Sequence, residues 1–261
     1  MPRTVTATRY VTPLREGGSL PAIIEADDAG LYVVKFRGAG QGAKALIAEL
    51  IAGELARELG LRVPEVVLVE LDPALGRNEP DSEIRELLKA SAGLNLALDY
   101  LPASVTFDPV ADPVPTAAEA SGIVAFDAYI TNVDRTPRNP NMLTWHRNLW
   151  LIDHGASLYF HHSWDDWEAR SQGRFAPIKD HVLLPWATAL TEAGRHLGAR
   201  ITRDGVERIV GAIPEAWLTS TESPFPTAEA HRAAYATWLL RRLEAVPGFI
   251  EEADRARAQL V

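Results

Sequence analysis

The N-terminal part of the chain alternates short apolar runs with polar turns, and one long helical pattern interrupts them. Apolar runs at 21–25 and 31–36 flank residues 27–30, whose composition is typical of a turn, so a β-hairpin is predicted. From 43 to 59, apolar residues recur at helical spacing, and a glycine follows as a stop signal. Residues 94–101 have the composition of a further strand.

The C-terminal part has a different pattern. A stretch rich in Pro and Asp at 102–115 is typical of a connector, and we place a lobe boundary there, between residues 1–101 and 102–261. Beyond it, Thr116 and Glu119 form a capping box that begins an apolar helix. Apolar periodicity predicts further helices at 182–197, 204–213, 227–246 and 248–259.

The composition excludes several classes of protein. With 261 residues, 47% of them apolar and 23% charged, the chain is typical of a globular protein with an ample core. A formal net charge of −9 argues against nucleic acid as a partner. The absence of cysteine excludes disulfides, thiolate nucleophiles and cysteine zinc sites. No apolar stretch is long enough to span a membrane and the N-terminus has no apolar signal core, so we expect a cytoplasmic protein without a membrane partner.

The segment 127–155 contains the polar side chains that are most suitable for catalytic chemistry. Asp134 lies in a loop with two prolines, Asn139 follows in the same loop, and Asp153 ends a predicted hairpin. Phosphoryl transfer needs a carboxylate to receive a proton from the acceptor, and an amide and a second carboxylate to hold magnesium. The interval from Asp134 to Asn139 equals that of the kinase catalytic loop, and Asp153-His154-Gly155 stands where Asp-Phe-Gly would. Taken singly, each residue is also typical of a turn cap or a strand end.

A lysine in the N-terminal hairpin is a candidate phosphate ligand. Lys35 interrupts the apolar strand 31–36, and kinases use a strand lysine to reach the nucleotide phosphates. A solvated lysine on an edge strand is the alternative. Glu49, on the helix that follows, is the candidate partner of its ammonium group. Gly18 and Ser19 offer a close backbone and a hydroxyl to phosphate oxygens, although such residues are also ordinary in turns.

Three runs of the sequence resemble the HipA-like kinases, relatives of the phosphatidylinositol 3- and 4-kinase fold. They are Asn132-Val133-Asp134-Arg135, Asn139-Pro140-Asn141-Met142-Leu143 and Leu149-Trp150-Leu151-Ile152-Asp153-His154-Gly155. In that wider group the loop usually has His two positions after the Asp, and here Thr136 takes this place. Asn141 competes with Asn139 as a metal ligand, because spacing favours Asn139 and adjacency to the strand favours Asn141.

This resemblance implies a bilobal α+β fold of the protein-kinase type. The N-lobe would be small and β-rich with one long helix, and the C-lobe would be mostly helical. ATP and Mg²⁺ would bind in the cleft between the lobes, and the γ-phosphoryl group would pass to a hydroxyl. The acceptor is unknown, with Ser or Thr of a protein as the expectation.

The resemblance also implies roles for individual residues. Asp134 would be the catalytic base or orienting group, and Lys35 would anchor the phosphates. Asp153 and either Asn139 or Asn141 would hold the metal. Backbone groups at the crossing between the lobes would hold the adenine, in Asp99, Tyr100 and Leu101.

Other functions stay open at this point. A pseudokinase that binds nucleotide without turnover is suggested by the missing loop histidine and the poor glycine loop. A metal-dependent hydrolase would use His161, His162 and Asp153, although adjacent histidines on an extended chain point to opposite faces. Residues 38–43 fit the dinucleotide fingerprint Gly-x-Gly-x-x-Ala, but the acidic residue expected about 20 positions later comes further on, at Glu70.

Overall fold

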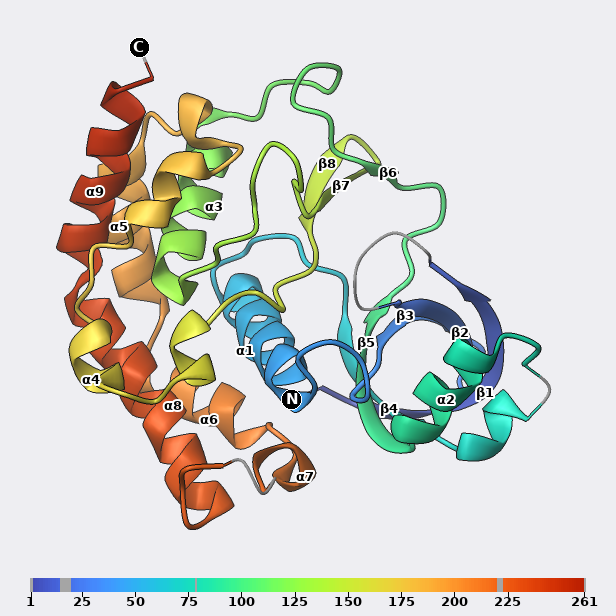
Figure 1. Ribbon diagram of the computed structural model, residues 1–261. Coiled ribbons are helices and arrows are strands. Elements are labelled where there is room, and N and C mark those ends of the chain that lie inside the picture. Colours follow the sequence, from blue (N-terminus) through green and yellow to red (C-terminus); the bar gives the residue numbers. More distant parts are fainter. Residues whose placement is uncertain (1, 15–19, 78, 220–222, 261) are drawn as a thin grey trace.

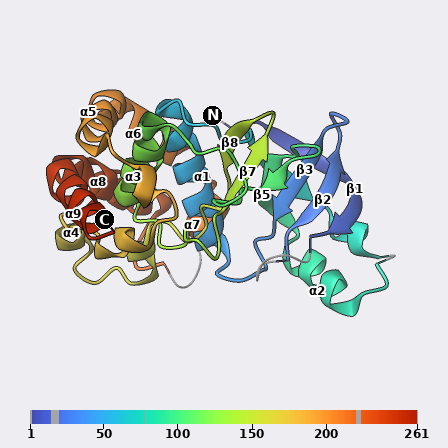
Figure 2. The same ribbon diagram turned by 90° about the horizontal axis from the view of Figure 1, so that it is seen from above.

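The computed structural model describes residues 2–14, 20–77, 79–219 and 223–260, and the described chain forms two lobes. In Figure 1 a β-barrel lies on one side and a group of helices on the other, with α1 (Ala43–Glu58) between them. Figure 2 shows the same division from above. The bilobal α+β fold expected from the sequence is confirmed.

The N-lobe is built on a closed barrel with the strand order β1-β2-β3-β5-β4. Neighbouring strands are antiparallel except β1 and β4, whose parallel pairing closes the barrel. The strands are β1 (Thr4–Pro13), β2 (Ala22–Ala26), β3 (Leu31–Lys35), β4 (Val66–Leu71) and β5 (Gly93–Asp99). Two helical segments connect β4 to β5, the 3₁₀ turn η1 (Pro73–Gly76) and α2 (Ser82–Ala90).

Alternation along the strands separates the barrel core from a face that meets the rest of the protein. In β3, Tyr32 and Val34 are buried in the barrel core, whereas Lys35 lies on the opposite face. In β5, Leu96 and Leu98 point away from the barrel and belong to a larger core that includes α1. The barrel is therefore attached to the C-lobe through β5 and α1.

The C-lobe is a helical group whose core is continuous with α1. Its central helix, α3 (Ala117–Ile130), begins at the predicted capping box, where Glu119 N donates to Thr116 Oγ1 at 3.2 Å. The other α-helices are α4 (Trp167–Arg170), α5 (Leu190–Arg200), α6 (Arg203–Gly211), α7 (Glu215–Leu218), α8 (Ala228–Glu244) and α9 (Val246–Ala258). Short 3₁₀ helices are η2 (Tyr159–His162), η3 (Ala176–Asp180) and η4 (Leu184–Trp186).

A small sheet lies between the two lobes (Figure 2). It contains β6 (Val105–Thr106), β7 (Met142–Trp145) and β8 (Asn148–Leu151), in that order. β7 and β8 form the hairpin that the sequence predicts ahead of Asp153. The segment that carries the candidate chemistry is therefore placed at the junction of the lobes.

One sequence-based expectation needs correction, and the sheet topology adds an argument against the dinucleotide fingerprint. The helix predicted from residue 182 begins later, as α5 at Leu190, because Pro185 lacks a backbone donor and interrupts the pattern with a short 3₁₀ turn. The dinucleotide fingerprint at 38–43 requires adjacent parallel strands on either side of its helix. Here β3 and β4 flank α1 but are not neighbours, since β3 pairs antiparallel with β5.

No described helix is long and apolar enough to cross a membrane.

His161 is buried in the C-lobe, and its Nδ1 lies 3.0 Å from Tyr235 Oη. Burial lowers the pKa of His161 well below its usual value, and the charges of His162, Lys44 and His231 lower it further. The folded protein thus holds this imidazole neutral, whereas the unfolded chain takes up a proton below a pH of about 6.5. Stability is fully present above that pH and decreases below it, by up to about 1.4 kcal/mol per pH unit for this group.

We therefore expect the free energy of unfolding to fall between about pH 7 and about pH 5, and to fall less steeply in His161→Gln. The measurement is urea denaturation of both proteins across this range. His146→Gln, which changes an exposed imidazole, is the matched control and should keep the wild-type slope. Identical slopes for wild type and His161→Gln would contradict the assignment.

Candidate active site

Lys35 projects from β3 into the space between the lobes. Its Nζ lies 2.7 Å from Glu49 Oε2 of α1 and 2.5 Å from Asp153 Oδ1, beyond the end of β8. The Lys35 side chain is only 12% exposed, so the ammonium group has little access to water. The structure thus brings together three residues that the sequence analysis selected from distant parts of the chain.

These three groups set one another's charge. Burial by itself would lower the pKa of Lys35, but Glu49 and Asp153 outweigh burial and raise that pKa above its usual value. Burial would likewise raise the pKa of Glu49, yet the charge of Lys35 and the hydrogen bond from His154 bring it down to about 2. Near neutral pH, a protonated lysine therefore faces an ionised glutamate.

His154 belongs to this site, although the sequence analysis gave it no role. It is fully buried, with Nδ1 3.4 Å from Glu49 Oε1 and its ring edge-to-face with Phe126. In the sequence, the only indication of its importance was that His154 takes the place of Phe in the Asp-Phe-Gly motif of kinases. A Cβ on Gly155, the next residue, would lie 3.6 Å from Ala45 Cβ. This segment therefore packs directly on the first turn of α1.

Asp134 lies in a loop that is ordered by amide side chains. Its carboxylate accepts hydrogen bonds from Asn139 Nδ2 at 2.8 Å and from Asn141 Nδ2 at 3.2 Å. Its backbone N–H donates to Asn132 Oδ1 at 3.1 Å. Asn139 is exposed and Asn141 is buried, and both candidate metal ligands lie beside the candidate base.

Asp153 adopts a left-handed backbone conformation, with φ of 56°. Such a conformation is uncommon for a residue with a Cβ, Asp adopts it more readily than most residues, and residues held in it cluster at functional sites. Just before it, Ile152 N donates to the backbone oxygen of Asn141 at 3.0 Å. The loop of Asp134 and the strand that leads to Asp153 are therefore fixed to each other.

A buried ionic network supports the Asp134 loop, and the sequence analysis did not identify it. Arg135 Nε donates to Asp127 Oδ2 of α3 at 2.5 Å, and neither side chain is exposed. His181 Nε2 lies 2.9 Å from the same oxygen, and Asn132 Nδ2 donates to Asp127 Oδ1 at 3.0 Å. Burial alone would raise the pKa of Asp127, but the charge of Arg135 and the hydrogen bond with His181 hold it below its usual range.

This network bears on the histidine that the loop lacks at Thr136. The imidazole of His181, a residue much further along the chain, contacts Asp127 and so helps to support the loop. The usable signal in the sequence was Asp127, a carboxylate inside an otherwise apolar helix, because a buried carboxylate needs a charged or hydrogen-bonding partner.

A cavity of about 550 Å³ opens beside Lys35 and Asp153. The predicted adenine-binding residues Asp99, Tyr100 and Leu101 line the same cavity. Its apolar walls come from both lobes and include Val33, Pro64, Leu98, Leu143 and Ile152. A mostly apolar cavity with a few convergent polar groups is typical of a small-molecule or cofactor site.

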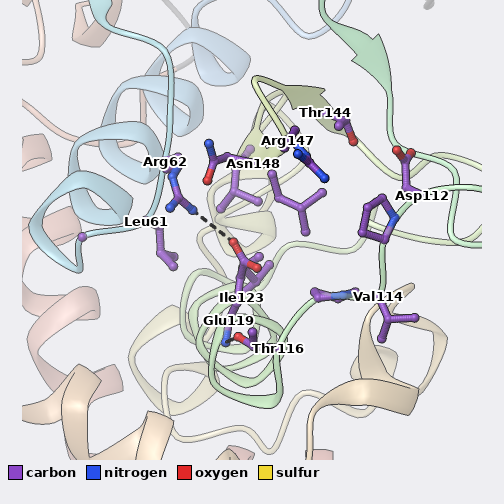
Figure 3. A pocket seen from close by; sticks show the side chains of 15 residues that line it. Leu61, Arg62, Asp112, Val114, Thr116, Glu119, Ile123, Thr144, Arg147 and Asn148 are labelled. Carbon is purple, nitrogen blue, oxygen red and sulfur yellow. Dashed lines mark hydrogen bonds and ion pairs between the residues drawn. The ribbon is translucent and has the colours of Figure 1, made fainter.

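A second cavity, of about 520 Å³, is lined by β7, β8 and α3 but by none of the predicted site residues (Figure 3). An ion pair between Arg62 and Glu119, 3.1 Å long, lies in it. Arg147 also lines this cavity (Figure 3). We assign no part of the phosphoryl chemistry to it.

Some predicted site residues do not enter this geometry. Gly18 and Ser19 lie outside the described residues. His161 is buried against Tyr235, and within the described ranges no three His, Asp or Glu side chains are grouped to hold a metal ion. The described chain therefore gives no support to the hydrolase interpretation with His161 and His162.

The fold is similar to that of solved kinase structures. The crystal structure of a Helicobacter pylori proinflammatory kinase, CtkA, matches with a TM-score of 0.59 and 14% identity over 99% of both chains. The Golgi casein kinase with Mn and ADP bound matches with a TM-score of 0.53 and 12% identity, over 99% of this chain and 76% of that chain. A further crystal structure of the Golgi casein kinase has a TM-score of 0.51 and 12% identity, over 97% and 73% of the two chains. A search of curated proteins gives no match.

The two lobes and these structural relatives define a protein with a kinase-type fold. A family model described as HipA-like kinase matches residues 8–246. The chain belongs to the HipA-like kinase family, and the resemblance drawn from its three sequence runs is confirmed.

The buried network predicts a large effect of Asp127→Asn on stability. The substitution leaves the guanidinium of Arg135 buried without an ionic partner, and such a loss costs about 3–5 kcal/mol. We expect a decrease of this size in the free energy of unfolding measured by urea denaturation at neutral pH.

The matched control is Asp254→Asn, which removes an exposed Asp–Arg pair with Arg257. Because exposed pairs contribute about 0–1 kcal/mol, this variant should unfold almost as wild type does. A decrease for Asp127→Asn no larger than that of the control would show that the network does not support the loop.

Proposed function

We propose that this protein is an ATP- and magnesium-dependent phosphotransferase that transfers the γ-phosphoryl group to a Ser or Thr hydroxyl of a protein. The observation that carries the proposal is the position of Lys35, held between Glu49 and Asp153 at the wall of the cavity. The family, and a structural relative with Mn and ADP bound, support a nucleotide and a divalent cation as ligands.

The cavity suits an adenine ring. Its apolar walls offer a slot for a flat aromatic group. At the crossing between the lobes, Asp99 N and Tyr100 N already donate to backbone oxygens of Glu65 and Leu31. Within the described chain the N–H of Leu101 has no acceptor, and so it is available to a ring nitrogen of the base.

The triphosphate would extend from the adenine towards Lys35. The ammonium of Lys35 is the cationic group that lines this cavity among the described residues. The carboxylate of Asp153 and the side-chain oxygen of Asn139 or Asn141 are hard oxygen donors, which fits Mg²⁺. When bound, Mg²⁺ neutralises charge on the β- and γ-phosphates and orients them.

Asp134 would act on the acceptor. Its carboxylate receives the proton of the acceptor hydroxyl while the hydroxyl oxygen forms a bond to the γ-phosphorus, and the bond from that phosphorus to the β-phosphate oxygen breaks to release ADP. Asn139 and Asn141 hold the carboxylate in place through their hydrogen bonds to Asp134.

A polypeptide acceptor is consistent with the surface around Asp134. The neighbouring residues Val133, Arg138 and Asn139 are exposed, so a chain segment has room to approach the carboxylate. The name of the Golgi casein kinase, a structural relative, also points to a protein acceptor.

Asp134→Asn should lower kcat for phosphoryl transfer by about 10²–10⁴-fold, the usual contribution of a general base. ATP binding should change little, because Asp134 does not line the nucleotide cavity. The measurements are transfer from γ-labelled ATP with Mg²⁺, with mass spectrometry of the labelled residue, and calorimetric titration with ATP.

Asp180→Asn, which alters an exposed carboxylate, is the control and should retain wild-type turnover. Wild-type protein that binds ATP but transfers and hydrolyses none would identify a pseudokinase and contradict the proposal. Unchanged turnover in Asp134→Asn would remove this residue from the mechanism.

Glu49→Gln should lower kcat/KM for ATP by about 10–100-fold, because a hydrogen bond to a charged group is worth about 1.5–3 kcal/mol. Lys35→Met should lower it at least as much, and the double variant should be little worse than Lys35→Met, since the two residues act as a unit. Steady-state kinetics with varied ATP measures all three. Glu54→Gln, on the same helix and paired with Arg57, is the control; additive losses in the double variant would contradict the coupling.

A further inference from the structure

A separate cavity of about 450 Å³ lies at the N-terminus of α1. It is lined by the loop that leads into α1, by the segment after the Asp-His-Gly motif, and by the C-terminal helices. The residues that matter for its chemistry are Gly42, Lys44, His162, Trp164, Trp217 and His231. None of them belongs to the candidate active site.

The N-terminus of α1, which borders this cavity, carries partial positive charge that no acidic side chain of its first turn offsets. Gly42, the N-cap of α1, offers no side-chain acceptor, and the first turn contains no acidic residue. The first backbone N–H groups of a helix have no partner within the helix, and they carry partial positive charge that favours an anion. α1 is 16 residues long, so this end is that of a full helix.

The side chains of the cavity add to this character. Lys44 lies in the first turn of α1 and forms no ion pair with any described carboxylate. Burial, followed by the charge of Lys44, lowers the pKa of His162 and His231, although the contact with Leu218 O partly opposes this for His231, so both rings line the cavity as neutral hydrogen-bonding groups. No described Asp or Glu lines the cavity.

His231 provides independent evidence of a ligand. Its side chain lines the cavity, yet it is 6% exposed and stacks on Tyr235 with an interplanar angle of 9°. Its Nδ1 lies 3.1 Å from Ser223 Oγ and 3.3 Å from Leu218 O, and when Nδ1 accepts the hydroxyl hydrogen of Ser223 the neutral ring carries its own proton on Nε2. The other ring nitrogen, Nε2, is buried without a hydrogen-bond partner in the described chain. An unpaired buried polar atom is unfavourable unless a ligand or water satisfies it.

We propose that this cavity is a binding site for a phosphoryl group, either free phosphate or a phosphorylated Ser or Thr of a polypeptide. The helix N–H groups and Lys44 supply charge, and the imidazoles supply directed donors. A dianion with several acceptor oxygens satisfies this set of donors better than a carboxylate does. The indole rings of Trp164 and Trp217 also line the cavity and would pack against an apolar portion of a peptide.

Occupancy of the site should reach the candidate active site through α1. The helix begins at the cavity, its residue Ala45 packs against Gly155, and its residue Glu49 holds Lys35. A phosphoryl group bound at the first turn would therefore stabilise the helix position on which the Lys35–Glu49 pair depends. This coupling rests on the proposed function, whereas the binding itself does not.

The test is a titration of the full chain, labelled with ¹⁵N in its histidines, followed by imidazole NMR resonances. Inorganic phosphate is the first probe, and a short peptide with one phosphothreonine is the second. ADP and Mg²⁺ are present throughout to keep phosphate out of the nucleotide cavity. We expect saturable shifts of the His162 and His231 resonances, which are assigned with His162→Gln and His231→Asn. Tighter binding of the peptide would identify a polypeptide source, and binding no tighter than that of phosphate would identify free phosphate.

Lys44→Ala should raise the dissociation constant for phosphate and for the phosphopeptide at least about tenfold, because it removes the cation from the site. Lys44→Arg, which keeps the charge, should restore most of the affinity and shows that the Ala variant has not lost binding through misfolding. Lys89→Ala, at an exposed lysine of α2, should bind as wild type does. Absence of saturable shifts, or equal affinity in Lys44→Ala and wild type, would overturn the proposal.

Measuring turnover together with phosphate binding distinguishes a failure of this proposal from a failure of the proposed function. If the chain is an active kinase, phosphate or the phosphopeptide should change kcat/KM for ATP in wild type and not in Lys44→Ala. Saturable shifts in a protein without turnover would leave the phosphoryl site standing and contradict the kinase activity instead.

Discussion

The contact on which the rest of the structure depends is the ion pair between Lys35 and Glu49. A lysine that is 12% exposed and a glutamate with no exposure lose most of their hydration, and only their proximity offsets that cost. The pair joins the barrel to α1, so the two lobes cannot take an arbitrary relative position. Asp153, at 2.5 Å from the same ammonium, adds the end of the β7–β8 hairpin to this arrangement.

α1 belongs to both halves of the protein. It follows β3 in the chain, but its buried face packs in the larger core with the C-lobe helices and with Leu96 and Leu98 of β5. Glu49 is thus positioned by the C-lobe while its partner is positioned by the barrel. His154 strengthens the same junction, because it is buried beside Glu49 and lies next to the Gly155 that packs on α1. Geometry at the site is therefore a property of how the two cores meet.

The sequence predicted those features that residue type, order and periodicity encode. The helix at Ala43–Glu58 and the hairpin before Asp153 follow from apolar spacing, and Lys35 and Glu49 were selected together and are found in contact. The strand β1 could not be predicted, because most of its residues are exposed and its parallel pairing with β4 is a long-range contact without a local signal. The boundary between residues 101 and 102 stays a prediction.

The supporting residues were harder to predict than the reacting ones. Nothing in the local sequence around His181 indicates that its ring lies 2.9 Å from Asp127, because this contact exists only after α3 and the following segments have packed. The same holds for Arg135, whose motif position suggested a loop residue but whose guanidinium is fully buried. A motif lists the residues that meet the substrate, whereas the residues that hold them depend on tertiary structure.

The charges of the candidate site explain why a divalent cation belongs in the proposal. In the described cavity, the ammonium of Lys35 is already balanced by Glu49 and Asp153, and Asp99 adds a further carboxyl group at the wall. A triphosphate that enters such a cavity meets more negative than positive charge, and the interaction at short range and low dielectric is strongly unfavourable. One lysine cannot reverse this balance. A metal ion beside Asp153 would change the sign of the local field, so that the same carboxylate that repels the nucleotide becomes the group that holds its counter-ion.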